Sequence, residues 1–268
     1  MEQNLSKKTR TESDLIGSRE VPESALYGVQ TLRGIENFRI SKFHLNEYPL
    51  FIQALAITKM GAAVANRELD LLTEEQTDAI LKACKEILEG KHHEQFPVDM
   101  IQGGAGTTTN MNANEVIANR ALELLGHQRG EYQYCSPNDH VNRSQSTNDA
   151  YPTAIHIGLY YTHLKLVKHF VELIESFRKK GKEFAHVIKM GRTQLEDAVP
   201  MTLGQTFNGF ASILEHEVKN LDFAAQDFLT VNMGATAIGT GITAEPGYAE
   251  KCIADLRKIT GLDFSLED

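Results

Sequence analysis

The sequence predicts a mainly α protein in which a loop-rich, mostly helical N-terminal domain precedes a bundle of long helices. Two long segments, residues 153–187 and 202–229, carry apolar residues at alternating steps of three and four. Such seams are typical of long helices that pack side by side. The residues before them mix short helical patterns with glycine- and proline-containing turns. We therefore predict two domains, residues 1–141 and 142–268.

Composition limits the classes of function. The chain has 268 residues, of which 41% are hydrophobic and 24% charged, as in ordinary soluble proteins. A net charge of -9 argues against a nucleic-acid surface, which needs clustered Lys and Arg. Three widely spaced cysteines argue against a disulfide framework. Because no signal sequence or apolar run of about 18 residues is present, we expect a cytoplasmic protein that does not enter a membrane.

The N-terminal elements follow in order. Residues 1–14 are charged and without periodicity, which predicts a mobile tail. Residues 17–38 predict turns with one or two short strands. Helical spacing begins at Tyr48, and Thr73 with Gln76 predicts a capping box that opens a second helix ending at Gly90.

A glycine-rich segment, residues 103–114, reads GGAGTTTNMNAN and leads into a helical pattern. A loop that feeds a helix N-terminus presents backbone N–H groups that favour an anion. It is neither a Walker loop nor a dinucleotide fingerprint, because the required lysine and third glycine are absent. The alternative is a capped loop whose hydroxyls satisfy local backbone groups. The segment alone leaves both interpretations open.

A second polar run, residues 136–152, reads SPNDHVNRSQSTNDAYP and joins the two predicted domains. It is too varied for a low-complexity linker. It is therefore either a short solvated connection or the wall of a polar site.

The bundle segments predict an antiparallel helical hairpin with a bend at residues 191–200. We expect the phenylalanines on both seams to lie in the core. A second glycine-rich turn covers residues 232–243, and a last helix covers 248–261. This leaves the seams under-covered, which predicts either an incomplete bundle or oligomer contacts.

Several chemistries are excluded by missing motifs: the Gly-x-Ser-x-Gly elbow, the His-Glu-x-x-His zinc pattern and any Cys-x-x-Cys pair. What remains is three loops rich in hydroxyls and amides, residues 103–114, 136–152 and 191–197. Such groups hold carboxylates without carrying net charge. The sequence thus predicts a site for a small anionic substrate, a carboxylic acid, with no metal ligands.

These loops resemble the signatures of the aspartase/fumarase superfamily. The resemblance rests on GAGTTTNMNANE at 104–115, PNDHVN with SQSTND at 137–149, and GRTQLEDA at 191–198. Within the superfamily the chain is more similar to aspartate ammonia-lyases than to class II fumarases. Thr147 stands where fumarases usually carry a second serine, and Gln194 where fumarases and some aspartases carry a histidine.

The resemblance implies an aspartase/fumarase-like fold and reversible elimination of ammonia from L-aspartate to give fumarate. A serine base removes a proton, and an aci-carboxylate intermediate is held by a ring of donors. Thr107, Ser146 and Thr147 would hold the β-carboxylate, Asn148 and Gln194 would face the amino group, and Thr193 would face the α-carboxylate. The resemblance implies no organic cofactor, possible activation by magnesium, and a homotetramer whose sites are shared by three subunits.

The third superfamily signature, Gly-Ser-Ser-x-Met-Pro-x-Lys-x-Asn, is absent. Because it supplies the base serine, no catalytic base is expected in this chain. We therefore predict the N-terminal portion of an aspartase, with an incomplete bundle, that is inactive alone. The alternatives are a class II fumarate hydratase and a non-catalytic helical scaffold.

Overall fold

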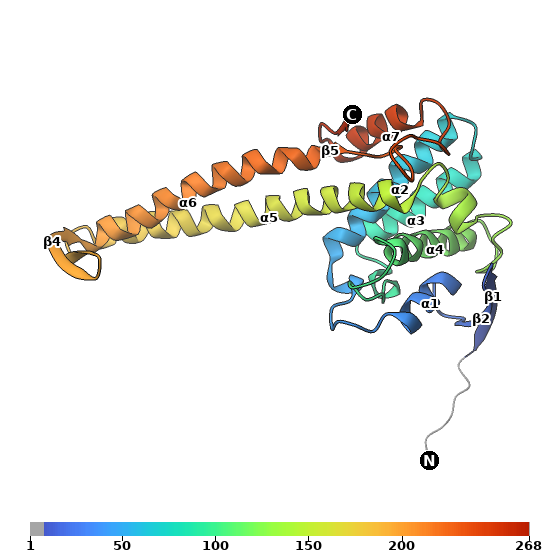
Figure 1. Cartoon of the computed structure of the whole chain (residues 1–268), viewed down its shortest axis with the longest axis horizontal. Coiled ribbons are helices and arrows are strands. Elements are labelled where there is room, and N and C mark those ends of the chain that lie inside the picture. Colours follow the sequence, from blue (N-terminus) through green and yellow to red (C-terminus); the bar gives the residue numbers. More distant parts are fainter. Residues whose placement is uncertain (1–7, 268) are drawn as a thin grey trace, which may run out of the picture. The chain divides into compact units, whose positions relative to one another are not determined.

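The computed structural model describes residues 8–267, which form two compact units (Figure 1). The first unit contains the described residues up to Gly158 together with those from Leu229 onward, and the second contains Leu159–Phe228. Helices dominate both units, so the predicted mainly α class is confirmed. The domain division between residues 141 and 142 stays a prediction. None of the helices within residues 8–267 is long and apolar enough to cross a membrane.

Four helices form the core of the first unit: α2 (Pro49–Glu68), α3 (Glu74–Leu88), α4 (Thr107–Leu124) and α7 (Tyr248–Thr260). α2 packs against α3 and α7, and α3 packs against α4. Most residues of α2 and α4 are buried, as expected of helices covered on several faces. Helix α2 approaches α7 closely at Gly61, where an added Cβ would lie 2.9 Å from the Leu256 side chain.

The helix ends of this unit follow the sequence closely. Thr73 and Gln76 form the predicted capping box at the start of α3, which ends before Gly90. Helix α7 ends before Gly261, which has a φ of +71°. Short helical turns connect these elements: η1 (Leu45–Glu47), η2 (His93–Gln95) and the π-helix η3 (Pro137–Val141).

The N-terminal segment corrects the prediction of a mobile tail. β1 (Thr9–Asp14) pairs antiparallel with β2 (Gly17–Pro22); residues 1–7 lie outside the described residues. The hydroxyls of Thr9 and Thr11 donate to the Glu20 carboxylate across the strands, while the Glu12 side chain is buried. Polar cross-strand pairs thus stabilise a hairpin that has no apolar alternation.

A further helix, α1 (Val29–Asn37), forms where turns and a strand or two were predicted. The buried carboxylate of Glu115 on α4 accepts hydrogen bonds from the backbone N–H groups of Gly28, Gln30 and Thr31. A cap supplied from a distant part of the chain leaves no local signal.

The second unit is an antiparallel hairpin of α5 (Thr147–Glu183, from Leu159 onward) and α6 (Leu203–Ala225). The seams meet as predicted: the ring centroid of Phe207 lies 6.0 Å from Phe177 and 5.7 Å from Phe184. The prediction of core phenylalanines is corrected, because these rings are only half-buried and Phe210 is 48% exposed. The predicted bend is a β-hairpin of β3 (Ile188–Thr193) and β4 (Glu196–Thr202).

The chain then returns to the first unit. α6 continues into η4 (Gln226–Leu229), and β5 (Thr230–Val231) pairs parallel with β6 (Ser265–Leu266). Between β5 and α7 lies the predicted glycine-rich turn.

Candidate functional site

The start of α5 corrects the predicted helix 153–187 and places three predicted site residues, Ser146, Thr147 and Asn148, in or beside its first turn. The helix begins early despite Pro152, which has no N–H to donate to the Asn148 carbonyl. The Nδ2 of Asn232 donates to that carbonyl instead, at 3.1 Å. A side chain from the glycine-rich turn thus allows the helix to include the site residues.

The loop that precedes α5 is braced from α2. Ser144 has a φ of +62°, a left-handed conformation that costs energy for a residue with a side chain. Its hydroxyl donates to Oδ1 of the buried Asn66 at 2.7 Å, and Nδ2 of Asn66 donates to the Arg143 carbonyl at 2.9 Å. These two bonds hold the strained residue in place and fix where Ser146 begins.

Asp149 connects the same turn to the glycine-rich turn 232–243. Its side chain is fully buried, with Oδ1 accepting from the Ser146 N–H at 2.9 Å. Oδ2 accepts from the N–H groups of Gly234 at 3.1 Å and Thr236 at 2.9 Å. Burial raises the pKa of Asp149, and the backbone donors act in the opposite direction.

The Asn148 side chain is exposed, and its Nδ2 donates to the Ala237 carbonyl at 2.8 Å. Thr107 is the first residue of α4, and its hydroxyl donates to the Gly104 carbonyl at 2.5 Å. The predicted loop 103–114 is therefore shorter than expected, because its threonines and asparagines belong to the helix.

The glycine-rich loop before α4 and the start of α5 line one open cleft of about 600 Å³. Gly106, with a φ of +92°, lies so close to α5 that an added Cβ would be 2.5 Å from the Tyr151 ring. Asn148 is the predicted site residue in the cleft lining, which comprises Met100, Gln102, Ala105, Gly106, Asn148, Tyr151, Pro152 and Ile155. Two of the three predicted loops therefore meet at this cleft.

Residues 146–148 at the start of α5 are called the wall below. Sequence reasoning missed Lys59 of α2, which is fully buried behind this wall. Its ammonium donates to the side-chain oxygens of Asn110 at 2.7 Å, Asn142 at 3.0 Å and Gln145 at 2.8 Å. Nδ2 of Asn110 in turn lies 3.2 Å from Oγ1 of Thr147. A lysine inside the apolar run ALAITKMGAAVA was the signal available in the sequence.

Burial lowers the pKa of Lys59 to about 7. The negative charge of the buried Asp149 acts in the opposite direction, as do the amide oxygens that accept from the ammonium. Burial thus disfavours the charged forms of both Lys59 and Asp149, and the hydrogen bonds and charges around each side chain oppose that effect.

The remaining predicted residues, Thr193 and Gln194, belong to the second unit. They lie at the turn between β3 and β4, where Gln194 and Leu195 have φ values of +46° and +70°. Their side chains are exposed. The lining of the open cleft described above does not include them.

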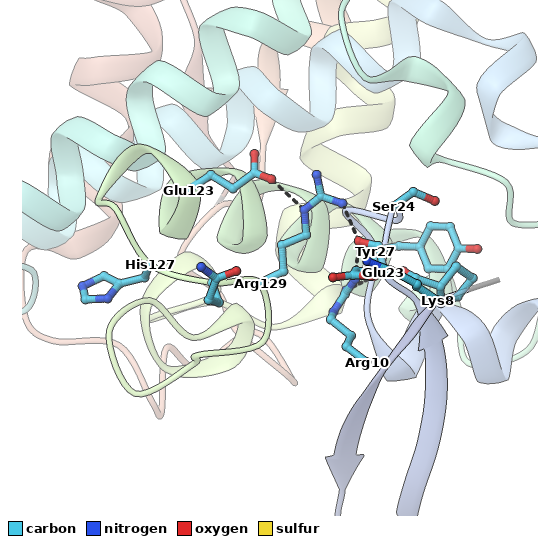
Figure 2. Close-up of a pocket in the computed structure, with 10 residues that line it drawn as sticks. Lys8, Arg10, Glu23, Ser24, Tyr27, Glu123, His127 and Arg129 are labelled. Atoms are coloured by element: carbon cyan, nitrogen blue, oxygen red, sulfur yellow. Dashed lines mark hydrogen bonds and ion pairs between the residues drawn. The ribbon is translucent and has the colours of Figure 1, made fainter. Parts of the chain in front are cut away.

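A separate cavity of about 920 Å³ contains none of the predicted residues (Figure 2). Arg10 donates to the carbonyls of Pro22, Ala25 and Tyr27. Arg129 donates to the Glu123 carboxylate at 2.6 Å and the Glu23 carbonyl at 2.8 Å, as the dashed lines in Figure 2 show. These guanidinium groups bind backbone carbonyls of the segment around β2, so we assign Arg10 and Arg129 a structural role.

Within residues 8–267, no three His, Cys, Asp or Glu side chains gather in an arrangement that could hold a metal ion. The cysteines Cys84, Cys135 and Cys252 are free and buried, and burial raises their thiol pKa values. The polar side chains in the lining of the open cleft are those of Gln102, Asn148 and Tyr151.

Comparison with known proteins gives consistent matches. A family model described as Lyase matches residues 17–268. An aspartate ammonia-lyase from Pseudomonas aeruginosa is 56% identical over 254 residues, covering 94% of this chain and 54% of the relative. An aspartate ammonia-lyase from Escherichia coli K12 is 52% identical over 258 residues, covering 96% of this chain and 54% of the relative.

Solved structures match the fold. A fumarate lyase:delta crystallin from Brucella melitensis, with cobalt bound, has a TM-score of 0.93 and 50% identity over 97% of this chain and 57% of that one. A class II fumarase from Schistosoma mansoni has a TM-score of 0.88 and 36% identity over 95% of this chain and 53% of that one. The chain thus spans about half the length of the curated relatives it matches.

Proposed function

The chain belongs to the lyase family whose model matches residues 17–268, and we propose that it forms the N-terminal part of an aspartate ammonia-lyase. The observation that carries the proposal is 52–56% identity to aspartate ammonia-lyases over at least 94% of the chain. The fumarase match is lower, at 36% identity. The full-length parent means here a protein of the relatives' length that contains this sequence.

The proposed reaction converts L-aspartate to fumarate and ammonia. A serine alkoxide takes a proton from Cβ, and the electron pair of that C–H bond moves into the β-carboxylate as an aci-carboxylate. When the pair returns, it forms the Cα–Cβ double bond, and the Cα–N bond breaks with its electrons leaving on the ammonia. The resemblance assigns the base serine to a signature outside this chain, so we propose that the chain alone is inactive.

We propose that the wall at the start of α5 holds the β-carboxylate as it gains charge, through Ser146 and Thr147, with Thr107 beside them. The bracing by Asn66 and Asp149 supports this role, because donors fixed before reaction stabilise a developing charge without reorganising. A carboxamide has two N–H groups. The bond from Asn148 to Ala237 uses one of them, and the proposal assigns the other to the amino group.

Thr193 and Gln194 would face the α-carboxylate and the amino group from another copy of the chain. Both side chains are exposed, which leaves them free to contact another copy. Large exposed apolar side chains on the hairpin support assembly, because such surfaces are costly to leave in water. They are Leu164 48%, Leu166 44%, Val171 44%, Leu173 42%, Ile213 60% and Phe223 83% exposed. On this basis we propose that the protein forms a homotetramer with sites shared by three subunits. We also propose that it is located in the cytoplasm.

Magnesium prefers several carboxylate or carbonyl oxygens, and no group of three His, Cys, Asp or Glu side chains within residues 8–267 fits it. No step of the proposed reaction is therefore assigned to a metal. Activation by magnesium stays a prediction.

The experiment that tests the proposed function compares two substrates of the full-length parent. Purified parent is given L-aspartate or L-malate, and fumarate is followed by its ultraviolet absorbance. The proposal expects fumarate from aspartate at a much higher kcat/KM than from malate. Turnover of malate alone would identify a hydratase, and turnover of neither would favour a non-catalytic scaffold.

A further inference from the structure

Lys59 is a buried amine that the proposed reaction does not use directly, and its three oxygen neighbours match the three N–H groups of its ammonium form. An ammonium group has only donors. Each amide atom within hydrogen-bond distance of Lys59 must therefore be an oxygen, which fixes the orientation of the Asn110, Asn142 and Gln145 carboxamides. The orientation of Gln145 agrees, since its Nε2 donates to the Val141 carbonyl at 2.9 Å.

Because the oxygen of Asn110 accepts from Lys59, the group that Asn110 presents to Thr147 is its Nδ2. This group lies 3.1 Å from Oδ1 of Asn142 and 3.2 Å from Oγ1 of Thr147. Oδ1 of Asn142 already accepts from Lys59 and from Asn114. The hydrogen bonds therefore run in one direction: Lys59 donates to Asn110, and Asn110 donates to Thr147.

A threonine hydroxyl that accepts from Asn110 must point its own proton elsewhere. Within residues 8–267 the half-buried Thr147 hydroxyl accepts from Asn110 and donates no hydrogen bond, so its proton is available to a ligand. We propose that Lys59 is a positioning residue, which through Asn110 directs the Thr147 hydroxyl to donate to a substrate carboxylate. This proposal rests on the proposed function for the identity of the substrate.

The test is a double-mutant cycle in the full-length parent with aspartate as substrate. Thr147→Val removes the hydroxyl and is expected to lower kcat by about 10²-fold, the loss typical of one oxyanion donor. Lys59→Met is expected to lower kcat by a similar factor. If Lys59 acts through Thr147, the double variant falls within about 2-fold of Thr147→Val alone. Factors that multiply would overturn the proposal, as would an unchanged kcat in Lys59→Met.

A second variant keeps the test valid if Lys59→Met does not fold. Asn110→Asp preserves shape and still accepts from Lys59, but it cannot donate to Thr147. The new carboxylate instead accepts the Thr147 proton, so kcat should fall about 10²-fold. The fall should disappear in the Thr147→Val background. A fall that persists there would show charge repulsion and refute the positioning role.

One readout does not depend on activity. Neutron diffraction from crystals of the parent locates deuterons, and the Thr147 deuteron is expected to point away from Asn110, with both Asn110 Nδ2 deuterons present. A Thr147 deuteron directed at Asn110 would overturn the proposal even in a parent that turns over no aspartate. Failure of the proposed function and failure of the positioning role are thus distinguished.

Discussion

Removing the charge of Asp149 should loosen the candidate wall while leaving its shape. The carboxylate accepts three backbone N–H bonds, one through Oδ1 and two through Oδ2. In Asp149→Asn a single amide oxygen must serve donors on both sides, and its N–H₂ group faces the others. At least one buried hydrogen bond is therefore lost, and at that position the N–H₂ group of the new asparagine faces a backbone N–H group, so that two donors point at each other.

The magnitude follows from these bonds. A hydrogen bond to a charged group contributes about 1.5–3 kcal/mol, and an unsatisfied buried donor costs about 1–3 kcal/mol. Burial raises the pKa of Asp149 despite its hydrogen bonds, so relief of desolvation offsets the loss of the charge. The remaining cost is that of the opposed buried donors. We expect Asp149→Asn to lower the free energy of unfolding by about 1–3 kcal/mol.

Urea denaturation of the chain measures this change. The matched control is Asp78→Asn, an exposed aspartate on α3, which should change stability by no more than about 0.5 kcal/mol. Hydrogen exchange should also accelerate at Gly234 and Thr236 in the variant. A loss no larger than that of the control, with unchanged exchange, would refute the role given to Asp149.

Three other perturbations have defined outcomes. Gly106→Ala places a Cβ 2.5 Å from a ring on α5 at a φ of +92°, so it should cost about 1–3 kcal/mol in a urea titration; a neutral change would contradict the close approach. Asn232→Ala should cost about 1 kcal/mol, but much less in a Pro152→Ala background, where the helix regains its own donor; equal costs would contradict the substitution of donors. Glu86→Gln concerns pH: the Arg120 hydrogen bond lowers the pKa of Glu86 from its ordinary value of 4.5 to about 2, so its stabilisation is full above the ordinary value and is lost as pH falls toward 2. The stability gap between wild type and Glu86→Gln, up to about 3 kcal/mol near neutral pH, should close in acid, and a constant gap would refute this.

The elements that the sequence predicted correctly have local causes. Helices α3 and α7 are bounded by a Thr73 capping box and by Gly261, and each signal lies within a few residues of the end that it sets. The seams of α5 and α6 were visible because the hairpin pairs apolar side chains at regular spacing.

The elements that were missed have distant causes. The cap of α1 is a carboxylate on α4, Glu115, so the helix has no start signal of its own. The early start of α5 depends on Asn232, which lies 84 residues away from the carbonyl it satisfies. β1 consists of polar pairs with a buried Glu12, and no hydrophobic alternation marks it.

The candidate site divides in the same way. Ser146, Thr147 and Asn148 were recognised from a motif, and the structure adds how they are held. The role of Lys59 could not be assigned, because only the packing of α2 against the loop before α5 brings it there. The role of Asp149 depends on the N–H groups of Gly234 and Thr236, which lie far along the chain. The roles given to Thr193 and Gln194 stay proposals, since one chain places them in a separate unit.

The most direct test of the central claim is an assay of the purified chain alone beside its full-length parent, with fumarate absorbance as the readout. If the chain carries the binding wall while the base lies elsewhere, the parent forms fumarate from aspartate and the chain forms none. Aspartate-dependent fumarate formation by the chain alone would contradict the account.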